Sequence, residues 1–333
     1  MRTDTDAPLE IVCPAGTPAA LRTAVDAGAD SVYCGFRDET NARNFPGLNF
    51  DRPEMRDGIA YAHRHGAKVL IAINTFPRAG DQALWHRAVD DAAAMQADAV
   101  ILADIGLLAY TAKRHPSLRI HLSVQAAAAN ARSIGFYVEE FAVRRVVLPR
   151  VLSIAEIARI NAAIACETEV FAFGGLCVMA EGRCSLSSYA TGKSPNMHGV
   201  CSPASHVAYR EEGEELVSRL GEFTINRVDR HAPVAYPTLC KGRFKTVLGS
   251  GHIFEEPASL DARQLLPQLH DAGVAALKIE GRQRSRAYTR AVVSAFRAAV
   301  DAMARGDPIP GGLLGDLTEG QRATCGAYLK AWR

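Results

Sequence analysis

Short runs of β-branched and aliphatic residues alternate along the chain with longer segments in which apolar residues recur every three to four positions. Such short runs are typical of buried strands, and the longer segments of helices that bury one face. The strands are predicted over residues 9–13, 31–36, 68–75, 99–104, 119–125, 145–149, 169–173 and 275–280. The helices are predicted over residues 17–29, 52–65, 81–96, 106–115, 132–141, 153–165, 260–272 and 286–304. A strand followed by a helix, eight times over, predicts an α/β fold, a parallel (β/α)8 TIM-like barrel, with a doubly wound open sheet as the alternative.

The seventh unit interrupts this rhythm. Between residues 174 and 257 Gly, Ser and Pro accumulate together with four of the cysteines, and no clean strand-helix period is visible. We interpret this as one long insertion between strand seven and helix seven, with the charged stretch 210–219 as a solvated helix or loop. The expected organisation is a flexible tail over residues 1–8, a barrel domain over 9–305 with the insertion 174–257 inside it, and a C-terminal extension over 306–333.

Polar residues follow the predicted strands where a barrel of this kind carries its chemistry, at the carboxyl ends. They are Asn41, Arg43, Asn74, Asp104, Gln125, Arg150, Glu280 and Arg282. The arginines are candidates for binding an anionic substrate, and the amides for orienting it. The two carboxylates are candidate catalytic bases or partners of the arginines, and the partner role is favoured. For each residue alone, a helix cap or loop hydrogen bond explains the position equally well, so the prediction depends on their convergence on one rim. Lys278 is expected to pair with a carboxylate.

Composition narrows the range of functions. Of 333 residues, 38 are Lys or Arg and 36 are Asp or Glu, which gives a net charge of +2. This balance argues against a surface that coats nucleic acid, and 48% hydrophobic residues exclude wholesale disorder. No apolar run approaches the roughly 20 residues of a membrane span, and the chain starts with polar residues, so a cytoplasmic protein is expected.

Eight cysteines in a reducing compartment are unlikely to form a disulfide framework. Cys13, Cys34 and Cys166 end or follow apolar runs, where cysteine behaves as a small hydrophobic residue. The other setting is the insertion, where turn-forming and basic residues surround four cysteines. These candidate metal ligands are Cys177, Cys184, Cys201 and Cys240.

The spacing of the four cysteines is wide, with six, sixteen and thirty-eight residues between successive members. A structural zinc site normally uses pairs two to four residues apart, so zinc is disfavoured, whereas an iron–sulfur cluster accepts thiolates from separate loops. Glycines and cations adjoin the cysteines and suit an anionic cluster: Gly182, Gly192, Gly199, Gly242, Arg183, Lys241 and Arg243. The rival interpretation is a catalytic thiol paired with His198.

Long motifs surround these cysteines and the predicted strand ends. They read FGGLC at 173–177, EGRC at 181–184, SPNMHGVCSPA at 194–204, YPTLCKGR at 236–243 and LKIEGR at 277–282, with CPAG at 13–16 and NARNF at 41–45. Together they resemble the peptidase U32 family, over all but about the first eight residues. Much of that family has His where this chain has Phe173, so acid-base chemistry at that position does not carry over.

The resemblance implies that Cys177, Cys184, Cys201 and Cys240 hold a [4Fe-4S] cluster. It is nearest to the branch of the family that hydroxylates the ubiquinone precursor ring without dioxygen. That branch implies a heterodimer with a UbiV-like sister protein, prephenate as oxygen donor, and a sterol-carrier-type lipid-binding protein that presents the polyprenyl-phenol substrate. Hydroxylation of RNA bases and a non-catalytic, cluster-stabilised scaffold are the alternatives. Proteolysis is not supported, because no HExxH or GxSxG motif is present.

Overall fold

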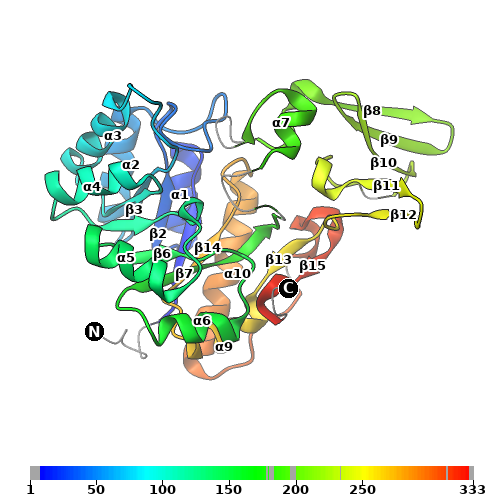
Figure 1. Ribbon diagram of the computed structural model, residues 1–333. Helices are drawn as coiled ribbons and strands as arrows, with labels where there is room; N and C mark the ends of the chain where they lie inside the picture. The colour runs from blue at the N-terminus through cyan, green and yellow to red at the C-terminus, as the bar shows by residue number, and fades with distance from the viewer. Residues whose placement is uncertain are drawn as a thin grey trace.

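The computed structural model describes residues 8–177, 179, 184–195, 200–232, 234–312 and 314–329 (Figure 1). Eight strands form the barrel: β1 (Glu10–Pro14), β2 (Ser31–Cys34), β3 (Lys68–Ile73), β4 (Ala99–Leu102), β5 (Ile120–Leu122), β6 (Arg145–Val147), β7 (Glu167–Gly175) and β14 (Ala276–Ile279). The helices around it are α1 (Pro18–Asp26), α2 (Arg52–Arg64), α3 (Ala83–Ala94), α4 (Ile105–Arg114), α5 (Ala131–Phe141), α6 (Ile154–Asn161), α9 (Leu266–Asp271) and α10 (Arg286–Arg305). None of the helices in these ranges is long and apolar enough to cross a membrane.

The barrel is closed by parallel pairing on both sides of β14. Strands β1 to β7 pair in sequence order, and β14 pairs with both β1 and β7. Closure of the sheet confirms the predicted (β/α)8 barrel, and the open-sheet alternative is wrong.

Several helices begin at capping residues that can be recognised in the sequence. Asp51 accepts from the backbone N–H of Glu54 while the Glu54 carboxylate accepts from the Asp51 N–H, and Ser153 forms the same reciprocal box with Glu156. Ser285 caps α10, which ends at Gly306 in the left-handed conformation. These caps fix where each helix leaves the rim of the barrel.

Apolar side chains pack in two layers. One layer lies between strands and helices and includes Leu21, Met55, Ile71 and Phe296, each at most 1% exposed. The second fills the barrel and includes Val12, Tyr33, Leu70, Ala72, Ala99, Ile101 and Ala276. Because neighbouring residues of a strand point to opposite faces, each barrel strand contributes to both layers. Cys13 and Cys34 are buried as predicted, and Cys166 is half-buried.

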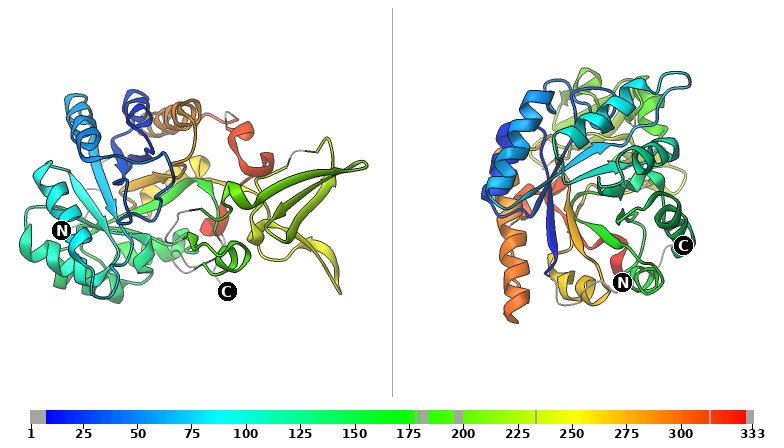
Figure 2. Two further views of the ribbon diagram at one scale, coloured as in Figure 1. Left: turned by 90° about the horizontal axis from the view of Figure 1, so that it is seen from above. Right: turned by 90° about the vertical axis from the view of Figure 1, so that its left-hand side faces the viewer.

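The insertion after β7 contains antiparallel sheet. Strands β8 (Val207–Glu212), β9 (Glu215–Leu220) and β10 (Phe223–Asp229) form one sheet, and β11 (Arg243–Thr246) pairs with β12 (Gly249–His252) in a hairpin. With α7 (Leu186–Thr191) before them, these strands project away from the barrel (Figure 2). The prediction of a solvated helix or loop over 210–219 is wrong, since this stretch lies within β8, β9 and the turn joining them.

The predicted helix over 260–272 is also shorter than expected. Its first residues lie in β13 (Ser259–Asp261), which pairs antiparallel with the end of β7, and the α-helix begins only at Leu266. Strand β15 (Ala323–Thr324) then pairs with β13, and the Tyr328 hydroxyl donates to the Phe171 carbonyl. The segment after α10 is therefore attached to the strand that leads into the insertion.

Candidate active site at the barrel mouth

Asn41 organises one side of the barrel mouth. Its side chain is fully buried, and its Oδ1 accepts from Arg282 Nη1 at 2.8 Å and from the Arg43 backbone N–H at 3.0 Å. Asn74 supports the same loop, because its Oδ1 accepts from the Ala42 N–H at 3.0 Å. Asn41 therefore positions Arg282 and the backbone of Arg43, two of the residues that the sequence analysis selected, and Asn74 braces the loop between them.

Glu280 lies between two of the three rim cations, Arg150 and Arg43. Its Oε2 is 3.0 Å from Arg150 Nη2, and its Oε1 is 4.0 Å from Arg43 Nη2. The Arg150 guanidinium also lies 3.5 Å from the centre of the Phe171 ring. This geometry supports a role for Glu280 as the ion-pair partner of these arginines. Gly174 permits it, since a Cβ at that residue would lie 2.7 Å from the Glu280 Cβ.

Arg282 is a buried cation with an incomplete set of partners. It is 8% exposed, and its Nε has no hydrogen-bond partner among the residues that the structure describes. Burial lowers the pKa of Arg282, and the nearby charge of Arg43 lowers it further. Gly16 of the CPAG motif packs against its backbone, because a Cβ there would be 2.1 Å from the Arg282 carbonyl oxygen. A buried guanidinium with an unused N–H at a barrel mouth is a group that favours an anion.

The other two rim candidates are Asp104 and Gln125. Asp104 caps α4, and its Oδ1 accepts from the Leu107 N–H at 2.8 Å. Gln125 is buried in the short turn Val124–Ala126 after β5. Of the eight rim residues, the structure joins Asn41, Arg43, Arg282, Arg150 and Glu280 by hydrogen bonds and ion pairs, with Asn74 bracing their loop.

The four insertion cysteines come from separate segments, and their charges affect one another's pKa values. Burial raises the pKa of Cys201 to about 11, and the charges of Cys177, Cys184 and Cys240 raise it as well, whereas Arg43 lowers it. The charges of Cys177 and Cys184 also raise the pKa of Cys240. The pKa of Cys201 therefore depends on the other three thiols and on Arg43, which also lies 4.0 Å from Glu280 at the rim. The eight cysteines form no disulfide within the described part of the chain.

These thiols suit an iron–sulfur cluster in the chemistry of the donor set, four sulfurs beside a cation. Among the described residues, however, no three His, Cys, Asp or Glu side chains converge tightly enough to hold a metal ion. Gly182, Arg183, Gly199 and His198, the proposed partner of a catalytic thiol, lie outside the described residues.

Lys241 anchors the segment that bears Cys240. It is 6% exposed and pairs with Glu319 of the C-terminal segment, beside Gly175 at the end of β7. Lys241 and Arg282 are both buried, so neither contributes to a cationic surface over residues 241–245 and 282–286. Sequence reasoning missed Glu319, which has no recognisable motif around it.

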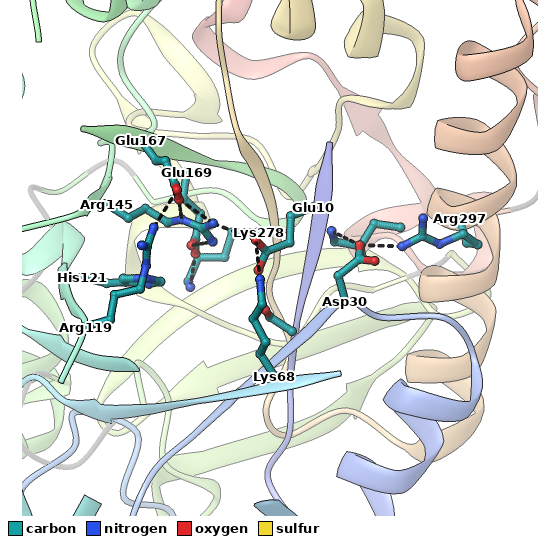
Figure 3. A network of polar contacts seen from close by, with 12 residues as sticks. Glu10, Asp30, Lys68, Arg119, His121, Arg145, Glu167, Glu169, Lys278 and Arg297 are labelled. Atoms are coloured by element: carbon teal, nitrogen blue, oxygen red, sulfur yellow. Dashed lines mark hydrogen bonds and ion pairs between the residues drawn. The ribbon is translucent and has the colours of Figure 1, made fainter. Parts of the chain in front are cut away.

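Sequence reasoning also missed a charged network inside the opposite, N-terminal end of the barrel (Figure 3). Arg145 lies within 2.7 Å of both Glu10 and Glu167, and 3.5 Å from the fully buried Glu169. Lys278 donates to Glu169 Oε1 at 2.5 Å, which confirms that it pairs with a carboxylate. The signal was present in Glu167 and Glu169, two charges at alternate positions of a buried strand.

Tyr33 lies between Lys278 of this network and Arg282 of the rim. The Lys278 Nζ is 3.8 Å from the centre of the Tyr33 ring, and the Arg282 guanidinium is 5.1 Å from it. Burial lowers the pKa of Lys278, and Glu169 opposes this effect. Lys278 and Tyr33 therefore connect the charged base of the barrel to Arg282 at its mouth, beside the apolar residues that fill the interior.

Comparison with known proteins agrees with the motifs. The model of peptidase family U32 matches residues 16–318. The chain belongs to the peptidase U32 family. One U32 relative is the tRNA hydroxylation protein P of Escherichia coli K12, 32% identical, with 92% of this chain and 71% of that protein aligned.

Two further relatives show the range of names within the family. The 23S rRNA 5-hydroxycytidine C2501 synthase of Escherichia coli K12 is 28% identical, with 90% of this chain and 40% of that protein covered. A protein named collagenase from Porphyromonas gingivalis is 27% identical, with 89% and 66% covered. Phe173, where much of the U32 family has His, is buried and packs against Phe296 and Tyr288.

Proposed function

We propose that this U32 protein is a component of an oxygen-independent hydroxylase that acts on an aromatic ring. The observation that carries the proposal is a barrel mouth where Arg43, Arg150 and Arg282 gather, with Arg43 acting on the pKa of Cys201, one of the four insertion cysteines. The names of two relatives, a tRNA hydroxylation protein and a hydroxycytidine synthase, support hydroxylation as the reaction class.

In this proposal Cys177, Cys184, Cys201 and Cys240 hold a [4Fe-4S] cluster. The cluster would supply redox chemistry at the mouth. Arg282, held by Asn41, and Arg43 would bind the carboxylates of an oxygen donor such as prephenate, because guanidinium groups bind carboxylates with two parallel hydrogen bonds. Glu280 would hold Arg43 and Arg150 in place. Asp104 and Gln125 border this region, and Asp104 would act chiefly through the helix that it caps.

We further propose the ubiquinone precursor as the ring that is hydroxylated, as in proteins of the UbiU type. The protein would then act as a heterodimer with a UbiV-like partner in the cytoplasm, and a sterol-carrier-type protein would deliver the polyprenyl-phenol. The net charge of +2 and the burial of Lys241 and Arg282 leave little cationic surface for a polynucleotide, which favours this substrate. RNA is the second candidate, favoured by the names of the relatives.

The test has two parts. Anaerobically purified protein should be brown and contain about four iron atoms per chain, as expected for a cluster held by four thiolates. Cys240→Ser should lose this iron, whereas Cys325→Ser should retain it. A colourless, iron-free wild type would refute the cluster.

Substrate identity needs a separate measurement. In cells grown without oxygen, deletion of the protein should abolish ubiquinone and leave the hydroxylated nucleosides of digested tRNA and rRNA unchanged. Arg282→Lys should lower ubiquinone formation while retaining iron. Loss of a hydroxylated nucleoside with normal ubiquinone would assign RNA as the substrate instead.

A further inference from the structure

The β11–β12 hairpin ends in two aliphatic residues that lie wholly in water. Val247 and Leu248 are 102% and 96% exposed, and they connect Thr246 to Gly249 at the turn. Turns of this kind normally carry Asn, Asp or Gly. Ile253 and Phe254, which follow β12, are also more than half exposed, at 54% and 52%. Such a concentration of apolar side chains at one projection indicates a surface that is covered in function.

The charges on the hairpin have one sign. Residues 243–254 include Arg243 and Lys245 and no Asp or Glu. Arg243 and Lys245 lie two residues apart on β11 and so on one face, and His252 pairs with Arg243 across the ladder. At about 3.3 Å per residue, Lys245 lies about 7 Å and Arg243 about 13 Å behind Val247. Lys245 is therefore set back from the apolar tip by about the 5–10 Å to which membrane-bound apolar faces enter the headgroup region, and Arg243 lies farther out.

The base of the hairpin borders a small cationic hollow. Arg243, His252 and Arg322 line it, together with apolar residues of β10 and of the segment after it. Its volume is about 160 Å³. Arg322 pairs there with Glu256 at 2.7 Å, so one of the two acidic residues that follow the hairpin is already neutralised.

We propose that the β11–β12 hairpin docks the protein onto anionic phospholipid bilayers. Val247 and Leu248 enter the boundary of the acyl chains, and Arg243 and Lys245 bind headgroup phosphates. The apolar tip and the positive charge behind it match the two components of an anionic membrane surface, apolar interior and negative headgroups. This docking does not depend on the reaction proposed above.

The experiment uses the full chain with unilamellar vesicles and measures the bound fraction by flotation. Wild type should bind vesicles of equal parts phosphatidylglycerol and phosphatidylcholine, and not vesicles of phosphatidylcholine alone. The double variant V247S/L248S should lose at least tenfold in affinity. The double variant R243Q/K245Q should lose about fivefold per removed cation.

The control is Ile105→Ser, which removes an aliphatic side chain that is 51% exposed on α4, far from the hairpin in Figure 1. It should bind vesicles as wild type does. Absence of binding to anionic vesicles, or equal binding by V247S/L248S, would overturn the proposal. Sedimentation velocity without lipid tests the other occupant: a dimer of wild type that V247S/L248S abolishes would assign the tip to a second copy of the chain and overturn membrane docking. Because both tip residues are fully exposed, thermal unfolding of the variant should match that of wild type.

Discussion

The charged network at the base of the barrel predicts how stability depends on pH, and Glu10 is its most informative member. The Glu10 side chain is 14% exposed, lies 2.7 Å from Arg145 Nη2, accepts from the Ser31 hydroxyl and lies 3.9 Å from Lys68 Nζ. Burial acts to raise the pKa of Glu10, but the hydrogen bond and charge of Arg145 outweigh it and lower the pKa from 4.5 to about 2. The folded state therefore favours the ionised carboxylate.

This shift sets both the size and the direction of the effect. A difference of about 2.5 pKa units corresponds to about 3 kcal/mol in the free energy of unfolding. Because the folded pKa is lower than the unfolded one, this stability is fully present above pH 4.5 and is lost as the pH falls from 4.5 towards 2. Glu10→Gln keeps the shape of the side chain and removes the charge, so it should destabilise the protein by about 3 kcal/mol at pH 7 and by progressively less in acid.

The assay is urea unfolding of both proteins at several pH values between 7 and 3, followed by circular dichroism. Glu256→Gln is the matched control, because its ion pair with Arg322 is 52% exposed on the carboxylate side, and exposed pairs contribute less than about 1 kcal/mol. A difference between wild type and Glu10→Gln that stays constant with pH would refute the reasoning. So would a loss at pH 7 no larger than that of the control.

Further predictions concern single contacts. Lys278→Met leaves the buried Glu169 carboxylate with only the more distant Arg145, so the free energy of unfolding should fall by about 3 kcal/mol. The double variant that also carries Glu169→Leu should recover most of this loss. If urea unfolding shows no recovery, the result would argue against the pair. Asn41→Ala removes the oxygen that accepts from Arg282 and from the Arg43 N–H, and should lower the free energy of unfolding by about 1–3 kcal/mol. It should also weaken binding of the oxygen donor, so an unchanged KM for that donor would exclude the orienting role. Gly16→Ala should disturb the backbone at Arg282 and lower the yield of folded protein, whereas Gly311→Ala, in open space, should not.

The barrel could be predicted because its signals are local. The eight strands and most of the helices follow from apolar periodicity and from caps such as Asp51 and Ser153, which are visible in the sequence. The stretch 210–219 was misassigned because β8 is exposed on both faces, so its side chains show no alternation of apolar and polar residues. In β13, Ser259–Asp261 is too short to show any period, and only its pairing with β7 makes it a strand.

The residues of the candidate site could be predicted from the sequence, but their pairing with one another could not. Strand ends identify Arg150, Glu280 and Arg282, since carboxyl ends of barrel strands share one rim. Which cation pairs with which carboxylate depends on three-dimensional approach, as in the contact of Glu280 with Arg150 rather than with the nearby Lys278. The Lys241–Glu319 pair joins residues seventy-eight positions apart, beyond the reach of any local pattern.

That long-range pair, with the attachment of β15 to β13 and of Tyr328 to β7, has a consequence for biosynthesis. The loop that carries Cys240 gains its last support only when residues up to 328 have left the ribosome. In the proposed cluster site, the Cys240 loop would then reach its full support only after the chain up to Tyr328 has emerged, and nascent chains stalled before Glu319 would lack the Lys241–Glu319 pair.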